Sequence, residues 1–197
     1  MIEEIEIITP SKYELSTKLR ITKKANSYFG GIMKTNYMVN SNKYSYLYTK
    51  NFVKISVASD HAGFMLKENI TEWLSNHSYV IIDNGCFSTE SVDYPDYAHK
   101  VAKDISSKMA ELGIVICGSG NGVNMVVNKY PKIRSALCWN VEISKLARLH
   151  NNANVCALPA RFITKDEAIL IIETFLNTSF EGGRHLKRID KIPIKDL

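Results

Sequence analysis

Residues 113–128 constrain the fold of this chain more than any other stretch. An apolar run over residues 114–116 stops at Cys117, glycines follow at positions 118, 120 and 122, and a helix-like segment then begins. Glycine lets backbone N–H groups approach an anion closely, and a following helix adds the positive end of its dipole. The stretch therefore predicts a buried strand that delivers a thiol into a cradle the size of a phosphate or an oxyanion.

From residue 52 onward, strand-like apolar runs alternate with segments of helical spacing. The expected strands cover residues 53–58, 80–82, 114–117, 135–138 and 155–158. The expected helices cover residues 64–74, 98–109, 141–149, 165–177 and 184–191, with one more that ends near residue 129. This alternation favours the α/β class, as a doubly wound, Rossmann-like sheet of five parallel strands inside an α/β/α sandwich.

The predicted fold also says where a site should lie. In open parallel sheets, ligands bind beyond the carboxyl ends of the strands, at the point where the strand order reverses. We expect the flavodoxin-like order, in which the first and third strands flank that point. Those strands end at Asp60-His61 and at Cys117-Gly118-Ser119, so polar and reactive groups gather at the expected site.

The first 51 residues differ from the rest. Asn, Tyr, Lys and Ser dominate residues 26–51 without clear periodicity, which predicts a poorly ordered extension over residues 1–51 ahead of a folded domain over residues 52–197. A targeting or partner-binding arm is the alternative. Residues 1–50 hold eight Lys/Arg and four Asp/Glu, so about +4 of the net charge of +5 lies there. The folded part therefore gives little reason to expect nucleic-acid binding.

The cysteines indicate reduced, buried thiols. They are Cys86, Cys117, Cys138 and Cys156, and no two have the Cys-x-x-Cys spacing of a zinc ribbon or a thioredoxin-type site. No apolar run approaches the 18 residues of a membrane span, and three early glutamates argue against a secretory signal. We therefore expect a cytoplasmic protein without a membrane segment, with organelle targeting by the N-terminal extension left open.

Each candidate functional group also has a structural interpretation. Cys117 could be an ordinary buried thiol, Asp60 a helix N-cap, and His150-Asn151-Asn152 the C-terminal cap of a helix. The basic candidates, which could equally belong to a solvated surface, are Arg161, Arg184 and Arg188. Since Arg184 and Arg188 are four residues apart, they share one helix face and suit a phosphate.

Two other enzyme classes fit the cradle poorly. A cysteine phosphatase needs an arginine six residues after its cysteine, and Val123 stands there. A dinucleotide site needs its glycine loop after the first strand and a carboxylate for the ribose. Here the loop follows the third expected strand, and residues 138–140 (Cys-Trp-Asn) supply no carboxylate.

Six motifs taken together resemble ribose-5-phosphate isomerase type B, in a broader family that includes the galactose-6-phosphate isomerase subunits. They are residues 59–64 (Ser-Asp-His-Ala-Gly-Phe), 93–95 (Asp-Tyr-Pro), 116–122 (Ile-Cys-Gly-Ser-Gly-Asn-Gly), 128–129 (Asn-Lys), 150–154 (His-Asn-Asn-Ala-Asn) and 181–185 (Glu-Gly-Gly-Arg-His). The resemblance covers about residues 52–193. It implies an aldose–ketose isomerase of the pentose phosphate pathway, which interconverts ribose 5-phosphate and ribulose 5-phosphate.

The resemblance also implies catalytic roles. Cys117 is expected to be the base that moves a proton between C2 and C1. Ser119, where the family more often has Thr, is expected to stabilise the enediolate together with the backbone amides of Gly118, Gly120 and Gly122. His150, from the partner subunit, and Asp60 are expected to open the furanose ring. One branch of the family uses a glutamate at the position of Val123, so this chain resembles the thiol-using type.

Substrate binding and assembly follow from the same resemblance. The expected phosphate ligands are His61, Arg161, Arg184 and Arg188, and the expected sugar contacts are Tyr94, Asn121 and Asn151. The resemblance implies neither a metal ion nor an organic cofactor. It implies a homodimer or a dimer of dimers with shared active sites, in which the C-terminal helix extends to the partner. An isomerase of a six-carbon sugar phosphate (allose 6-phosphate or galactose 6-phosphate) and a non-catalytic sugar-phosphate-binding protein are the alternatives.

Overall fold

The structure, a computed structural model, describes residues 20–29, 32–40 and 45–193. It divides into two compact units, Met1–Phe52 and Val53–Leu197, and each is described by itself. The division falls within one residue of the expected boundary. Within the described residues, every helix is too short or too polar to cross a lipid bilayer.

The first unit contains an antiparallel sheet. Its strands are β1 (Arg20–Phe29), β2 (Ile32–Asn40) and β3 (Ser45–Phe52), paired in that order. The structure thus differs from the expected extension without regular structure, although residues 1–19 lie outside the described residues. The Tyr, Thr, Val and Ile residues of these segments have high β-propensity, and this outweighs the polar composition on which the expectation rested.

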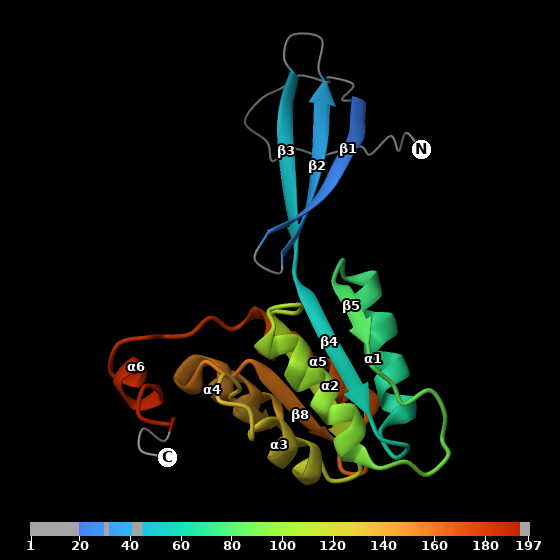
Figure 1. Ribbon diagram of the computed structural model, residues 1–197, viewed down its shortest axis with the longest axis vertical. Helices are drawn as coiled ribbons and strands as arrows, with labels where there is room; N and C mark the ends of the chain where they lie inside the picture. The colour runs from blue at the N-terminus through green and yellow to red at the C-terminus, as the bar shows by residue number, and fades with distance from the viewer. Residues whose placement is uncertain (1–19, 30–31, 41–44, 194–197) are drawn as a thin grey trace. The chain divides into compact units, whose positions relative to one another are not determined.

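The second unit is an α/β fold, which confirms the predicted class (Figure 1). Its strands are β4 (Lys54–Ser59), β5 (Val80–Asp83), β6 (Leu112–Cys117), β7 (Ser135–Leu137) and β8 (Val155–Pro159). Its helices are α1 (Phe64–Asn76), α2 (Tyr94–Ser106), α3 (Asn121–Val127), α4 (Val141–Asn151), α5 (Lys165–Asn177) and α6 (Arg184–Ile189). All strand pairs of this sheet are parallel.

The strand order corrects one expectation. It is β5-β4-β6-β8-β7, so the last two strands are exchanged relative to the flavodoxin-like order. The five residues of β8 are all buried, whereas the three residues of β7 are only half-buried. A strand buried on both faces belongs inside the sheet, and a short half-buried strand belongs at its edge. The first and third expected strands, β4 and β6, are neighbours as predicted.

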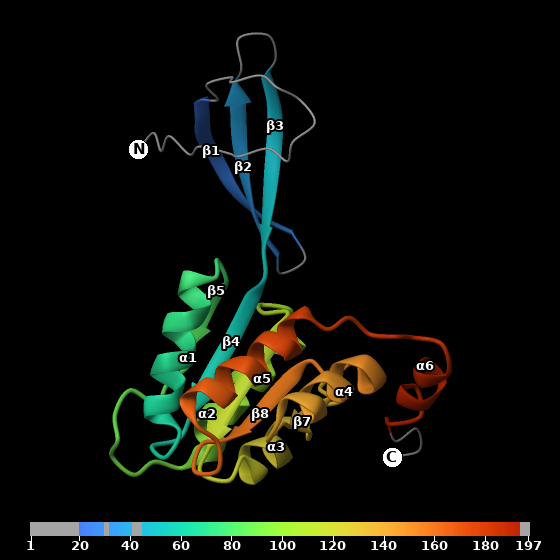
Figure 2. The same ribbon diagram turned by 180° about the vertical axis from the view of Figure 1, so that it is seen from behind.

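Helices cover both faces of the sheet. One face packs against α1, α4 and α5, with Ile114 and Ile116 of β6 in that core (Figure 2). The other packs against α2 and α3, with Val115 and Cys117 in its core. Successive side chains of a strand point to opposite faces, which explains this division. Cys117 therefore lies on the α2 and α3 side.

The second helix ends earlier than the sequence predicted. Met109 was expected on the buried face of a helix, but α2 ends at Ser106 and Met109 is exposed. Lys108 has a φ of 62°, a left-handed conformation that turns the chain away from the helix path.

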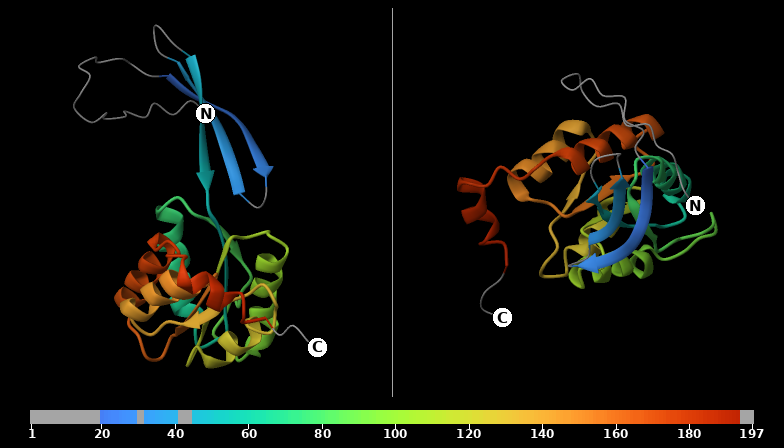
Figure 3. Two further views of the ribbon diagram at one scale, coloured as in Figure 1. Left: turned by 90° about the vertical axis from the view of Figure 1, so that its left-hand side faces the viewer. Right: turned by 90° about the horizontal axis from the view of Figure 1, so that it is seen from above.

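At the other end of the domain, an extended segment carries α6 away from the sheet to the end of α4 (Figure 3).

Candidate active site

The loop after β6, residues 118–122, forms a cradle over the Cys117 thiol, and we call it the cradle loop. Cys117 is 5% exposed, and its Sγ accepts a hydrogen bond of 3.1 Å from the N–H of Gly120. Gly120 has a φ of 73°, and a Cβ there would meet the Leu137 side chain and the Leu158 backbone. Only glycine combines this φ with so close an approach, so residue 120 fixes the curl of the loop.

Two of the predicted site residues lie against other glycines of the cradle loop. A Cβ on Gly118 would come within 3.1 Å of Nε of Arg161, and a Cβ on Gly122 within 2.7 Å of the Tyr94 ring. The Arg161 N–H also donates to the Gly118 carbonyl at 3.0 Å. Because residues 118 and 122 are glycines, the Arg161 guanidinium and the Tyr94 phenol can lie directly against the cradle loop.

The loop after β4 lies beside the cradle. The Asp60 N–H donates to the Ile116 carbonyl at 3.1 Å, and the Asp60 carboxylate accepts from the Gly63 N–H at 2.9 Å. Asp60 is 8% exposed. The hydrogen bond from Gly63 closes the turn over residues 60–63, whereas the N-cap of α1 is Gly63 without a side-chain hydrogen bond, so Asp60 is not the helix N-cap that its position suggested. One Asp60 carboxylate oxygen remains for a ligand. Nδ1 of His61 accepts from the Val92 N–H at 3.3 Å, so neutral His61 carries its proton on Nε2.

Ser119 and Asn121 are exposed at the open side of the loop, where Oγ of Ser119 accepts from the Asn121 N–H at 3.4 Å. The structure thus gathers one set of predicted residues where the strands end, which we call the carboxyl edge. The set is Asp60, His61, Tyr94, Cys117, Gly118, Ser119, Gly120, Asn121, Gly122 and Arg161.

The remaining predicted residues lie at the opposite end of the sheet, which we call the amino edge. Helix α4 follows β7 and leads into β8, so its last residues, His150 and Asn151, return to the amino ends of the strands. Arg134, just before β7, donates to the Asn151 and Asn152 carbonyls. Helix α6, which carries Arg184 and Arg188, packs on α4. The expected His150 and Asp60 pair is therefore not formed within one chain.

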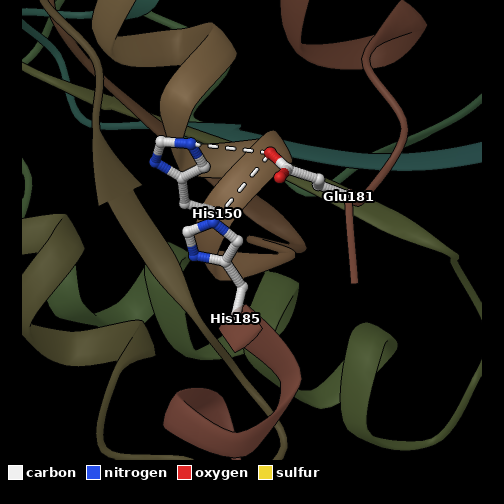
Figure 4. Close-up of side chains that lie close together, drawn as sticks. All are labelled: His150, Glu181 and His185. Atoms are coloured by element: carbon white, nitrogen blue, oxygen red, sulfur yellow. Dashed lines mark ion pairs between the residues drawn. The ribbon is translucent and has the colours of Figure 1, made fainter. Parts of the chain in front are cut away.

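The amino edge also holds two residues to which the sequence analysis gave no role. The imidazoles of His150 and His185 stack with centroids 4.2 Å apart and an interplanar angle of 6°. The Glu181 carboxylate lies 3.8 Å from Nε2 of His150 and 3.9 Å from Nε2 of His185 (Figure 4). Glu181 and His185 belong to the motif over residues 181–185 and have i, i+4 spacing, but neither signal pointed to His150 as their partner.

The comparison with known families and proteins agrees with this geometry. The sequence model described as Ribose/Galactose Isomerase matches residues 55–192. The chain belongs to this family. Ribose-5-phosphate isomerase B of Escherichia coli is 37% identical over 139 residues, which cover 71% of this chain and 93% of that protein.

Solved structures give the same result. The ribose 5-phosphate isomerase of Thermotoga maritima has a TM-score of 0.71 and 50% identity, covering 72% of this chain and 97% of that one. Ribose-5-phosphate isomerase B of Mycoplasma genitalium, solved with bound ribulose-5-phosphate, has a TM-score of 0.68 and 44% identity, covering 71% and 93%. The resemblance to ribose-5-phosphate isomerase type B is confirmed. The match to the family model begins at residue 55, beyond the first unit.

Proposed function

We propose that this isomerase interconverts ribose 5-phosphate and ribulose 5-phosphate through an enediolate. One observation carries the proposal: the buried Cys117 thiol lies at the carboxyl edge under the cradle loop, where the Gly120 N–H donates to its Sγ at 3.1 Å. The relative from Mycoplasma genitalium, 44% identical, is described with ribulose-5-phosphate bound. A thiolate can take a proton from carbon, and nearby N–H donors stabilise the oxyanion that results.

The proposed chemistry uses Cys117 and the cradle loop as follows. The Cys117 thiolate removes the proton from C2 of the open-chain aldose, and the electron pair moves into the C1 carbonyl. The same thiol returns that proton to C1, while the hydroxyl proton of O2 passes to O1. Ser119 and the loop N–H groups stabilise the charged oxygens. A positioned base contributes roughly 10²- to 10⁴-fold, and each oxyanion donor about 10²- to 10³-fold.

Ring opening and phosphate binding require the second set of residues. Because α4 ends at the amino edge, we infer that His150 of the partner subunit reaches Asp60 across a dimer interface. Arg184 and Arg188 of the partner subunit would join His61 and Arg161 on the phosphate. The exposed Arg184 and Arg188 side chains and the extended segment before α6 support this arrangement. Each chain then carries two half-sites.

A mixture of two inactive variants tests both the activity and the shared site. Cys117→Ala and His150→Ala are each expected to lose most of the conversion of ribose 5-phosphate. After the two are unfolded together and refolded, half of the dimers are mixed and each mixed dimer holds one intact site. Recovery of about one quarter of wild-type activity is expected from this counting. No recovery would overturn the shared site, and an inactive wild type would overturn the reaction.

The control mixture combines Cys117→Ala with Ser119→Ala, both at the carboxyl edge. A mixed dimer then has one change in each site, so no recovery is expected. Measuring kcat/KM of the wild type for five- and six-carbon sugar phosphates in the same assay decides the substrate length. A clear preference for a six-carbon substrate would replace ribose 5-phosphate in the proposal.

A further inference from the structure

Three side chains from the end of α4 and the C-terminal part of the chain meet at the amino edge. His150 comes from the last turn of α4, Glu181 from the segment before α6, and His185 from the first turn of α6. The Glu181 backbone N–H donates to the Leu149 carbonyl at 3.0 Å, which fixes that segment against α4. Figure 4 shows Glu181 facing one edge of both rings, with the second nitrogen of His150 pointing away from it.

The two histidines have different surroundings. The His150 side chain is 36% exposed, whereas that of His185 is 5% exposed and its buried Nε2 has no hydrogen-bond partner. Burial lowers the pKa of His185, and the neighbouring charges of His150, Arg184 and Arg188 act in the same direction, against Glu181. His150, the more exposed ring, is therefore the one of the pair that a substrate can reach.

We propose that Glu181 and His185 are positioning residues for His150. The Glu181 carboxylate holds the proton on Nε2 of His150, which leaves Nδ1 as the atom that exchanges a proton with the sugar. The flat face of His185 fixes the rotation of the His150 ring. This role rests on the proposed function of His150 in ring opening. The separation of 3.8 Å is an ion-pair distance, and contacts of this kind often shorten when substrate binds.

The same three side chains are also the donor set of a zinc site, two histidines and a carboxylate. The stacked geometry argues against that use. A metal ion lies in the plane of each imidazole that binds it, and two rings inclined by only 6° do not point toward one ion. Zinc binding by these three side chains is therefore not expected.

The test separates ring opening from proton transfer. Ribulose 5-phosphate is acyclic because its O5 carries the phosphate, so exchange of its C1 hydrogen in D₂O needs Cys117 but no ring opening. Glu181→Ala is expected to lower kcat for ribose 5-phosphate by about tenfold, less than the roughly 10²-fold expected when an acid–base group itself is removed. C1 exchange should stay within about twofold of wild type. Equal losses in both assays, or no loss in either, would overturn the proposal.

Conservative variants sharpen the test. Glu181→Gln keeps an acceptor oxygen for Nε2 and should retain most of the activity that Glu181→Ala loses. His185→Phe keeps a flat ring against His150 and should exceed His185→Ala in ribose 5-phosphate conversion. The positioning role would be wrong if Glu181→Gln were no more active than Glu181→Ala and His185→Phe no more active than His185→Ala. The matched control is Glu142→Ala, at the other end of α4, which should leave both assays unchanged.

Two further results keep the proposal distinct from its alternatives. Because Glu181 is exposed, its variants should fold even where a change at the buried His185 does not. In a competition assay with a chromogenic chelator, the wild type and Glu181→Ala should bind the same amount of zinc. A zinc site that is present in the wild type and lost in Glu181→Ala would mean that the three side chains bind a metal ion and do not position His150. A wild type that converts no ribose 5-phosphate would overturn the proposed function itself. If the wild type is active but Glu181→Ala loses equally in both assays, only the positioning role is overturned.

Discussion

The two edges of the sheet are built in different ways. At the carboxyl edge, strand ends and backbone N–H groups surround side chains that are buried, such as Cys117 and Asp60. At the amino edge, side chains from a helix end and a short separate helix meet, and Glu181, Arg184 and Arg188 are exposed. Under the proposed function, a single chain holds the proton-transfer residues at its carboxyl edge and presents His150, Arg184 and Arg188 to a partner subunit. We expect the two edges to differ in function as they differ in construction.

The largest effect is expected at the carboxyl edge. Cys117→Ala should lower kcat by at least about 10²-fold, because the base is lost while a small side chain keeps the fold. The conversion of ribose 5-phosphate and the far-UV circular dichroism spectrum measure the two parts of this expectation. The control is Cys156→Ala, which removes a buried thiol of β8 from the core. Near-normal turnover of Cys117→Ala would show that the base lies elsewhere.

The Gly120→Ala variant tests how far activity depends on the backbone conformation of the cradle loop. The alanine would have to keep a φ of 73°, and its Cβ would lie 3.0 Å from the Leu158 backbone. We expect a loss of about 1–3 kcal/mol in the free energy of unfolding, together with a lower kcat. The matched control is Gly182→Ala, at a φ of 74° with nothing within 4 Å of the new Cβ. Similar losses for both variants would reduce the effect to backbone strain alone.

At the amino edge the expected effect is on binding. Arg184→Ala should raise KM by about tenfold or more with a smaller change in kcat, since a charged hydrogen bond to phosphate contributes about 1.5–3 kcal/mol. Steady-state kinetics with ribose 5-phosphate measures both constants. Lys187→Ala, an exposed change on the same helix, is the control. An unchanged KM would take Arg184 out of the phosphate site.

The smallest effect tests whether proximity to the carboxyl edge is enough to affect activity. Thr164 caps α5 just beyond the end of β8, and its Oγ1 accepts from the Glu167 N–H at 3.3 Å. Thr164→Ala should lower the free energy of unfolding by about 1 kcal/mol in urea denaturation. The value of kcat/KM should remain that of the wild type. A reduced kcat/KM would mean that the end of α5 also supports the site.

The carboxyl edge could be predicted from the sequence because it depends on local pattern. Apolar runs locate the strands, and residues that follow parallel strands, such as Asp60 and Cys117, must meet at one edge. The helix expected over residues 165–177 belongs to the same local class, since α5 has these bounds and begins with a capping box of Thr164 and Glu167. Pattern alone therefore placed the cradle, the neighbouring loop and the start of α5.

The amino edge could not be predicted in the same way. The stacking of His185 on His150 depends on where residues 178–183 return to α4, and no periodicity encodes that path. The exchange of β7 and β8 depends on which strand buries more surface, which becomes visible only when helices cover both faces. In the first unit, the β-propensity of Tyr and Thr was hidden by a polar composition.

The exchanged strand order ties completion of the sheet to completion of the cradle. With β8 beside β6, the N–H of Ala160 donates to the Cys117 carbonyl at 2.9 Å, and that of Arg161 to the Gly118 carbonyl at 3.0 Å. A chain cut before Val155 would leave β6 with an open hydrogen-bonding edge and β7 without a neighbour. During synthesis, the Arg161 guanidinium can therefore reach the cradle beside Cys117 only after β8, the last strand of the sheet to be made, has paired with β6.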